Sequence, residues 1–244
     1  MRKSDIEELL SEVEEIVASL ETQKSKANTN SGILEISKPK VKSALEHLRS
    51  CLDYAAHDIY DFLYKDRDGK TEEQRGKMSL YFPYGKSLGD FHSSLGRSFK
   101  NLQSIHNEIY QLILSVQSFN SRKTWIYDIC NITNKIKHVE QRKQERLAMR
   151  TVKLTDAFSL NYNRGSNTNI IISGNVINGV KQSNDFVISG GQIRSDMSKI
   201  KEPIELVDWT DFAFKDSNIR IIDLIKTSYE HLRKFIDDLY LLLA

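Results

Sequence analysis

The sequence predicts a mainly α-helical protein with a small antiparallel β-meander inserted before a C-terminal helix. Apolar residues recur at three- and four-residue steps over residues 1–149 and again over 219–243, which is the helical period. Between residues 151 and 214 the period falls to two, and glycines separate short β-branched runs. Only three prolines occur in 244 residues, and scarce helix breakers favour long helices.

Composition is typical of a globular protein. Hydrophobic residues make up 39% of the chain and charged residues 28%, with a formal net charge of +2. No signal peptide is predicted, since acids interrupt the N-terminal residues at once, and no run reaches the roughly 18 apolar residues of a membrane span. Cys51 and Cys130 both fall within helical patterns, which favours buried thiols over a disulfide. We therefore expect a cytoplasmic protein without a membrane partner.

Four helices are predicted in the first 149 residues. The first covers residues 4–20, has an acidic face and precedes the polar linker TQKSKANTNSG, so residues 1–30 form an N-terminal segment. The other three are expected near residues 39–64, 88–119 and 123–149. Their apolar stripes predict an antiparallel bundle over residues 36–150.

The β-rich insertion is predicted to span residues 151–215. Strands are expected at residues 169–173, 175–180, 185–189 and 204–214. A strong amphipathic helix at 219–243, within the segment 216–244, is expected to pack back on the bundle.

The helix predicted at 123–149 has a polar stripe opposite its apolar side. The stripe consists of Asn131, Asn134, Lys135, His138, Arg142 and Arg146. A solvated face is the plain interpretation. The alternative is a cationic groove for phosphate, with His138 available for proton transfer. The asparagines favour this groove slightly, because a merely solvated helix would more often use Glu, Lys or Gln.

The second helix has a matching polar line at the edge of its apolar face. Arg49 and Asp53 lie four residues apart, with Tyr60 further along. They form either a surface ion pair or a half-buried pair that positions a polar group of the fourth helix. Antiparallel neighbours would bring the two lines together. We therefore predict that Asn134 or His138 hydrogen-bonds to one of these three side chains.

Other searches for catalytic or cofactor motifs find nothing. There is no phosphate-binding loop, dinucleotide fingerprint, HExxH or CxxC pair. His57 and Asp61 are four residues apart, as two metal ligands on a helix can be, but no third ligand follows at a diagnostic spacing. No metal and no cofactor are therefore predicted.

Three segments resemble a group of uncharacterised bacterial and phage helical proteins. The segments are SALEHLRSCLDYAAHDIY, YFPYGKS and IYDICNITNKIKHVEQ. The group has an LRS-x-LDY helix, an F-P-x loop and a later L-N-x-x-x-KH helix, and it is similar to HEPN-type domains. The resemblance covers roughly residues 41–146 and implies an antiparallel HEPN-like helical bundle.

The resemblance also implies an activity and an oligomeric state. Many HEPN domains are metal-independent ribonucleases of toxin and antiviral systems, and they work as dimers. Their motif is an arginine, a polar residue and, a few residues later, a histidine. Asn134 matches the polar residue and His138 the histidine, whereas Thr133 stands at the arginine position. Arg142 lies one turn beyond His138.

Three functions remain open at this point. The leading one is a non-enzymatic binding module, for RNA or another phosphate-bearing ligand, in bacterial defence or phage–host conflict. Its expected ligand-binding residues are Lys135, Arg146, Arg49, Asp53 and Tyr60. The alternatives are a metal-independent HEPN-type ribonuclease that uses His138, Asn134 and Arg142, and a structural oligomer. In such an oligomer the acidic first helix would dock on the basic fourth helix of a neighbour.

Overall fold

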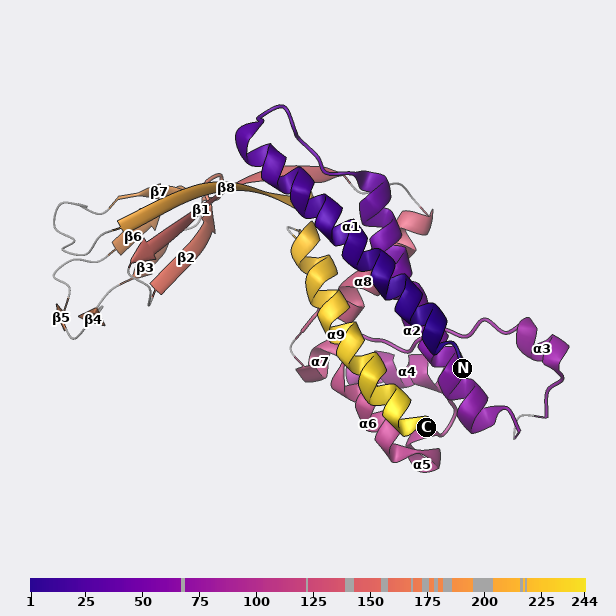
Figure 1. The fold of residues 1–244 in the computed structure, drawn as a ribbon. Helices are drawn as coiled ribbons and strands as arrows, with labels where there is room; N and C mark the ends of the chain where they lie inside the picture. The colour runs from indigo at the N-terminus through magenta and orange to yellow at the C-terminus, as the bar shows by residue number, and fades with distance from the viewer. Residues whose placement is uncertain are drawn as a thin grey trace. The chain divides into compact units, whose positions relative to one another are not determined.

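The chain forms two compact units (Figure 1). The helical unit consists of Met1–Glu21, Ser37–Arg142 and Ile221–Ala244, and the β unit consists of Thr22–Ile36 and Lys143–Arg220. Each unit is therefore assembled from segments that are distant in the sequence. The computed structural model describes residues 1–66, 69–121, 123–138, 143–154, 158–167, 169–172, 176–177, 180–181, 186–194, 204–215, 217 and 219–244.

Most of the regular structure is helical, so the predicted mainly α class is confirmed. The long helices are α1 (Lys3–Thr29), α2 (Lys38–Tyr64), α8 (Trp125–His138) and α9 (Ile221–Leu242). The short helices are α3 (Glu72–Gly76), α4 (Leu88–Ser98), α5 (Leu102–Ile105), α6 (Asn107–Ser115) and α7 (Ser118–Ser121). Within the described residues, no helix combines the length and the apolar character needed to cross a bilayer.

The core of the helical unit forms around α2. Leu45, Leu48 and Leu52 follow the helical period and are fully buried. The helix packs against α8 and α9, and α9 also packs against α6 and α8. Burying a leucine side chain stabilises a fold by about 1.5–3 kcal/mol. The apolar stripe of α2 therefore does more than helix propensity to hold it in place.

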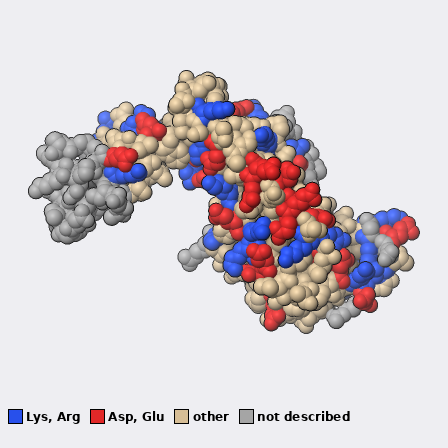
Figure 2. Space-filling view, in the orientation of Figure 1, with Lys and Arg blue, Asp and Glu red and all other residues tan. Residues whose placement is uncertain are grey.

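The acidic face predicted for the first helix is present on α1. Glu8, Glu12 and Glu15 are exposed, and Figure 2 shows a band of acidic side chains along this helix. Part of the face is already paired within the helical unit, since Arg233 of α9 lies 2.9 Å from Glu7.

Three of the predicted helix boundaries are wrong. Helix α1 continues to Thr29 through the expected linker. The helix expected at 88–119 is divided into α4 to α7, partly because Asn101 has a left-handed conformation (φ 59°) that a right-handed helix cannot contain. The helix expected at 123–149 ends at His138, because the residues from Gln144 onwards pair in a sheet.

The β unit contains one larger sheet, one smaller sheet and a short hairpin. Its strands are β1 (Gln144–Leu154), β2 (Phe158–Asn163), β3 (Ile170–Ile172), β4 (Val176–Ile177), β5 (Val180–Lys181), β6 (Phe186–Ser189), β7 (Gln192–Ile193), β8 (Ile204–Phe214) and β9 (Ile219–Arg220). The sheet orders are β2-β1-β8-β9 and β3-β6-β7, and β4 pairs with β5. All the pairs are antiparallel.

The strands expected at 169–173, 185–189 and 204–214 are confirmed as β3, β6 and β8, whereas the segment 175–180 contains β4 and the start of β5. A simple meander is wrong, because β8 returns beside β1 and pairs with it along its full length. Residues 143–150, expected in the helical bundle, therefore belong to the β unit. Val152, Tyr162 and Ile188 form a small core that joins strands of the two sheets.

Candidate functional site

Arg49 is the centre of a polar cluster inside the helical unit. The residue lies on α2 and is only 7% exposed. Its Nε donates to Asp53 Oδ2 at 3.2 Å, and its Nη1 donates to the sulfur of Cys130 on α8. The guanidinium also lies 5.3 Å from the ring centroid of Tyr84 and 6.0 Å from that of Tyr81. The two helices and the segment before α4 therefore meet at this one side chain.

Asp53 holds the segment between α3 and α4 in place. One carboxylate oxygen accepts from Arg49, and the other accepts from the backbone N–H of Phe82 at 3.0 Å. The ring of Phe82 is fully buried and packs edge-on against Phe235 of α9, with 5.3 Å between the centroids. The Asp53 carboxylate and the packing of the Phe82 ring thus hold residues 81–86, the YFPYGK segment, in place.

Gln117 fixes the other end of this segment. Its Nε2 donates to the carbonyl oxygen of Pro83, and its Oε1 accepts from the backbone N–H of Gly85, both at 3.2 Å. A Cβ at Gly85 would lie 2.4 Å from the backbone nitrogen of Phe91, so only glycine fits here. Sequence reasoning missed Gln117. The signal was a glutamine between the apolar residues of LSVQSF, where burial forces an amide to find partners.

Aromatic and cationic side chains lie together on the outer side of the cluster. Tyr84 and Tyr127 have ring centroids 6.3 Å apart, and the Lys86 ammonium lies 5.1 Å over the Tyr127 ring. Tyr81 is 57% exposed. We define the tyrosine face as Tyr81, Tyr84, Lys86 and Tyr127, with the exposed residues Asn134 and Lys135 of α8. It presents ring faces and positive charge from α8 and from the YFPYGK segment.

The protonation states of the cluster are fixed near neutral pH. Burial alone would lower the pKa of the Arg49 guanidinium, but Cys130 and Asp53 raise it above its ordinary value, so the group stays charged. Burial raises the pKa of the Cys130 thiol to about 11, which makes it an inert neutral thiol. Burial also raises the pKa of the Tyr84 phenol. None of these three groups exchanges a proton near pH 7.

The polar stripe predicted on the fourth helix is only partly placed beside the cluster. Asn134 Nδ2 donates to the Tyr84 hydroxyl at 3.0 Å, and not to a residue of α2 as predicted. The amide is therefore linked to Arg49 through Tyr84. His138 is the last residue of α8, and its side chain lies outside the described residues, as does the whole of Arg142.

Arg146 and Tyr60 are not part of the cluster. Arg146 lies on β1 in the β unit, so the helical stripe predicted to contain it is wrong. Its guanidinium instead donates to carbonyl oxygens at the end of α1, among them those of Ala27 at 2.7 Å and Ser31 at 2.8 Å. The hydroxyl of Tyr60 accepts from Lys70 at 3.0 Å, away from Arg49. Both residues therefore lie outside the Arg49 cluster, and the ligand-binding role expected of them stays a prediction.

His57 and Asp61, the pair considered as metal ligands, both interact with Arg2. Asp61 accepts from Arg2 Nη1 at 2.9 Å, and burial followed by the charge of Arg2 lowers the pKa of His57. In the part of the chain that the structure describes, no three His, Cys, Asp or Glu side chains are grouped so as to hold a metal ion.

Comparison with known proteins does not assign the Arg49 cluster. The chain matches no family model, and no curated protein or solved structure gives a significant match.

Proposed function

We propose that the helical unit is an HEPN-like bundle that binds single-stranded nucleic acid on the tyrosine face without cleaving it. The observation that carries this proposal is the group of tyrosine rings, two of them over the buried Arg49 and a third beneath the Lys86 ammonium. Bases stack on aromatic rings with little regard to sequence, while lysines attract the phosphates between them. Tyr81, with 57% of its surface exposed, and the half-buried Tyr127 offer the rings. Lys86 and Lys135 offer the charges.

A preorganised surface favours binding. Arg49 cannot contact phosphate itself, because Asp53, Cys130 and two tyrosine rings already surround its guanidinium. Its contribution is to hold α2, α8 and the YFPYGK segment in one arrangement. The conformational entropy of these side chains is then lost when the protein folds, so less is lost when the nucleic acid binds.

The residue at the arginine position of the HEPN motif argues against cleavage. Thr133 is 1% exposed, and its hydroxyl donates to the carbonyl oxygen of Ile129 at 2.8 Å. It cannot stabilise negative charge on a phosphate in the transition state. The buried thiol of Cys130 is neutral and offers no base. We therefore propose binding ahead of the ribonuclease alternative.

The test is fluorescence anisotropy of a labelled uridine dodecamer titrated with the protein at several salt concentrations. We expect binding at low salt that weakens as salt rises. Tyr81→Ala and Tyr127→Ala should each weaken binding by about 5- to 150-fold, since stacking contributes roughly 1–3 kcal/mol per base. Lys86→Ala and Lys135→Ala should each reduce the slope of log K against log salt by about 0.7.

The matched control is Lys226→Ala on α9, an exposed lysine outside the tyrosine face. This variant should keep both the affinity and the salt slope. Absence of binding at low salt, or equal effects of the control and the tyrosine-face variants, would overturn the proposal. Cleavage products that disappear in His138→Ala would instead support the ribonuclease alternative.

A further inference from the structure

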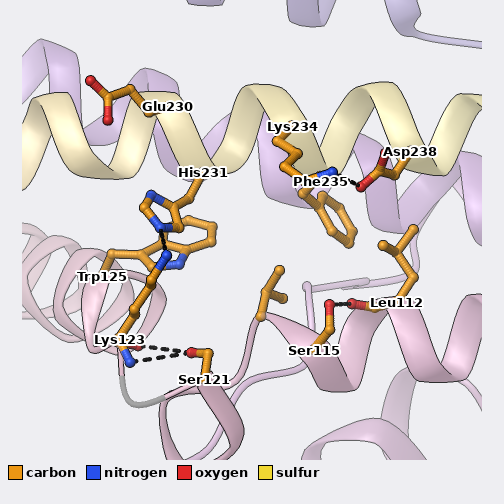
Figure 3. A pocket seen from close by; sticks show the side chains of 11 residues that line it. Leu112, Ser115, Ser121, Lys123, Trp125, Glu230, His231, Lys234, Phe235 and Asp238 are labelled. Carbon is orange, nitrogen blue, oxygen red and sulfur yellow. Dashed lines mark hydrogen bonds and ion pairs between the residues drawn. The ribbon is translucent and has the colours of Figure 1, made fainter.

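A second candidate site lies in a cavity of about 410 Å³ that shares no residue with the tyrosine face. The cavity is lined by Leu112 and Ser115 of α6, by Lys123 just before α8, by Trp125 at the start of α8, and by side chains of α9 (Figure 3). All of these belong to the helical unit. The volume is within the range of pockets that hold small organic molecules.

The floor of this cavity is apolar and is formed by buried aromatic rings. Trp125 is 3% exposed and Phe235 is 2% exposed, yet both line the cavity. Figure 3 shows the Phe235 ring pointing from α9 into the cavity beside Leu112. The Phe235 ring also packs in a T-shaped arrangement with Phe82 in the core. A ligand body placed here would bury apolar surface without reordering these rings.

The polar side of the cavity has a defined hydrogen-bond pattern. His231 Nδ1 lies 2.7 Å from the carbonyl oxygen of Thr227. A carbonyl only accepts, so Nδ1 carries the proton. His231 Nε2 lies 2.7 Å from the Lys123 ammonium, which only donates, so Nε2 accepts. The imidazole is therefore neutral in this arrangement and orients Lys123 without neutralising it.

Lys123 brings a positive charge to the cavity. The other lysine there, Lys234, is paired with Asp238 at 2.8 Å. Glu230 points away from Lys123 in Figure 3. Among the described residues, no carboxylate lies within ion-pair distance of Lys123. One cation at the edge of an apolar floor is complementary to a single anionic group on an apolar body.

We propose that this cavity binds a small monocarboxylate with an aromatic or branched aliphatic body. The carboxylate accepts from Lys123, whose remaining N–H groups are free of His231. The apolar body lies on Trp125 and Phe235. The proposal does not depend on nucleic-acid binding, because the two sites use different residues and different ligand chemistry.

The test compares 4-phenylbutyrate with the neutral analogue 4-phenylbutan-1-ol by isothermal titration calorimetry on the full chain. The carboxylate should bind more tightly than the alcohol by on the order of tenfold. Lys123→Met should reduce carboxylate affinity to that of the alcohol and leave alcohol affinity unchanged. The alcohol thereby reports whether the cavity of the variant is intact. Lys226→Met, on α9 but outside this cavity, is the matched control and should alter neither affinity.

A second readout locates the ligand. The chain has two tryptophans, so its NMR spectrum has two indole N–H signals, and Trp209→Phe identifies the signal of Trp125. On titration with 4-phenylbutyrate the Trp125 signal should shift and the Trp209 signal should not. Equal affinity of the carboxylate and the alcohol, an unchanged carboxylate affinity in Lys123→Met, or no binding at millimolar concentration would overturn the proposal. A shift of both indole signals would do the same, since it indicates non-specific binding.

Discussion

At the scale of single residues, the helical unit depends on a few buried polar side chains that each join several elements. Arg49 contacts α8 and the YFPYGK segment, and Gln117 contacts both Pro83 and Gly85. A buried polar group that loses its partner costs about 1–3 kcal/mol. Small changes at these positions should therefore act on the tyrosine face as well as on stability.

Gly85 provides the sharpest residue-scale prediction. Gly85→Ala should lower the free energy of unfolding by about 1–3 kcal/mol, because its Cβ would overlap the backbone nitrogen of Phe91. Gly96→Ala is the matched control, since α4 has open space around this position. Removing a flexible glycine from a helix should raise the free energy of unfolding by about 0.5–1 kcal/mol. Urea unfolding measures the free energy of unfolding of both variants, which should fall in Gly85→Ala and rise in Gly96→Ala.

The two cysteines should be unreactive in the folded protein. Burial raises the pKa of Cys51 to about 12 and that of Cys130 to about 11, against 9.0 for an ordinary thiol. The folded state thus favours the protonated thiols. Their contribution to stability is complete below pH 9 and is lost as pH rises through about 11 to 12. At mildly alkaline pH, a thiol-reactive disulfide reagent should label neither thiol in the folded protein and both thiols in denaturant. Rapid labelling of the folded protein would contradict the burial of the cysteines.

At the scale of elements, the C-terminal end of α1 is completed by a residue of β1. The last carbonyl groups of a helix have no partner within it. The Arg146 guanidinium donates to one of them, that of Ala27, to the carbonyl oxygen of Ser31 just after the helix, and to the hydroxyl of Thr210 on β8 at 3.1 Å. This contact is made within the β unit and gives a physical reason why α1 is longer than predicted.

Replacing this arginine tests that reason. Arg146→Lys should destabilise the β unit by about 1–3 kcal/mol, because one ammonium cannot reproduce the forked donors. Hydrogen exchange should accelerate at the end of α1, near Asn30. Arg150→Lys, at a pair with Asp208 whose carboxylate is half exposed, is the control and should cost less than about 1 kcal/mol. Equal rates of hydrogen exchange near Asn30 in both variants would contradict the proposed role of Arg146 at the end of α1.

Helices α2 and α9 are joined by a buried carboxylate. Asp58 is 1% exposed and accepts from the Tyr240 hydroxyl and from Arg2. Tyr240→Phe should lower the free energy of unfolding by about 1–2 kcal/mol, since a charged acceptor loses a donor. Tyr229→Phe, at an exposed hydrogen bond to Glu14 on the same helix, should cost less than about 0.5 kcal/mol. Thermal unfolding compares the two variants directly. Equal losses of stability would contradict the role of the Asp58–Tyr240 hydrogen bond.

At the scale of the whole molecule, the resemblance to HEPN-type domains predicts a dimer. Light scattering at micromolar concentration should give a particle of twice the 28.2 kDa of the chain. A particle of 28.2 kDa would contradict this expectation. Mixing variants that each carry a different inactivating change would then test whether the tyrosine face needs both copies.

The amino-acid sequence by itself determined the helix and strand classes where one face is buried along a whole element. The spacing of Leu45, Leu48 and Leu52 predicts α2, because burial of one face imposes the period of that element. The i, i+4 spacing likewise predicted the contact between Arg49 and Asp53.

Only the tertiary structure decided which distant segments complete these elements. Residues 144–149 fit a helical pattern, yet they form β1, because the pairing with β8 satisfies their backbone groups along the whole strand. The site was decided in the same way. Cys130 and Tyr84 have no local signal that places them around Arg49, and the signal at Gln117 indicates burial but not its partners in the YFPYGK segment. Their contacts arise from packing between elements, and sequence periodicity reports only which face is buried, not what that face meets.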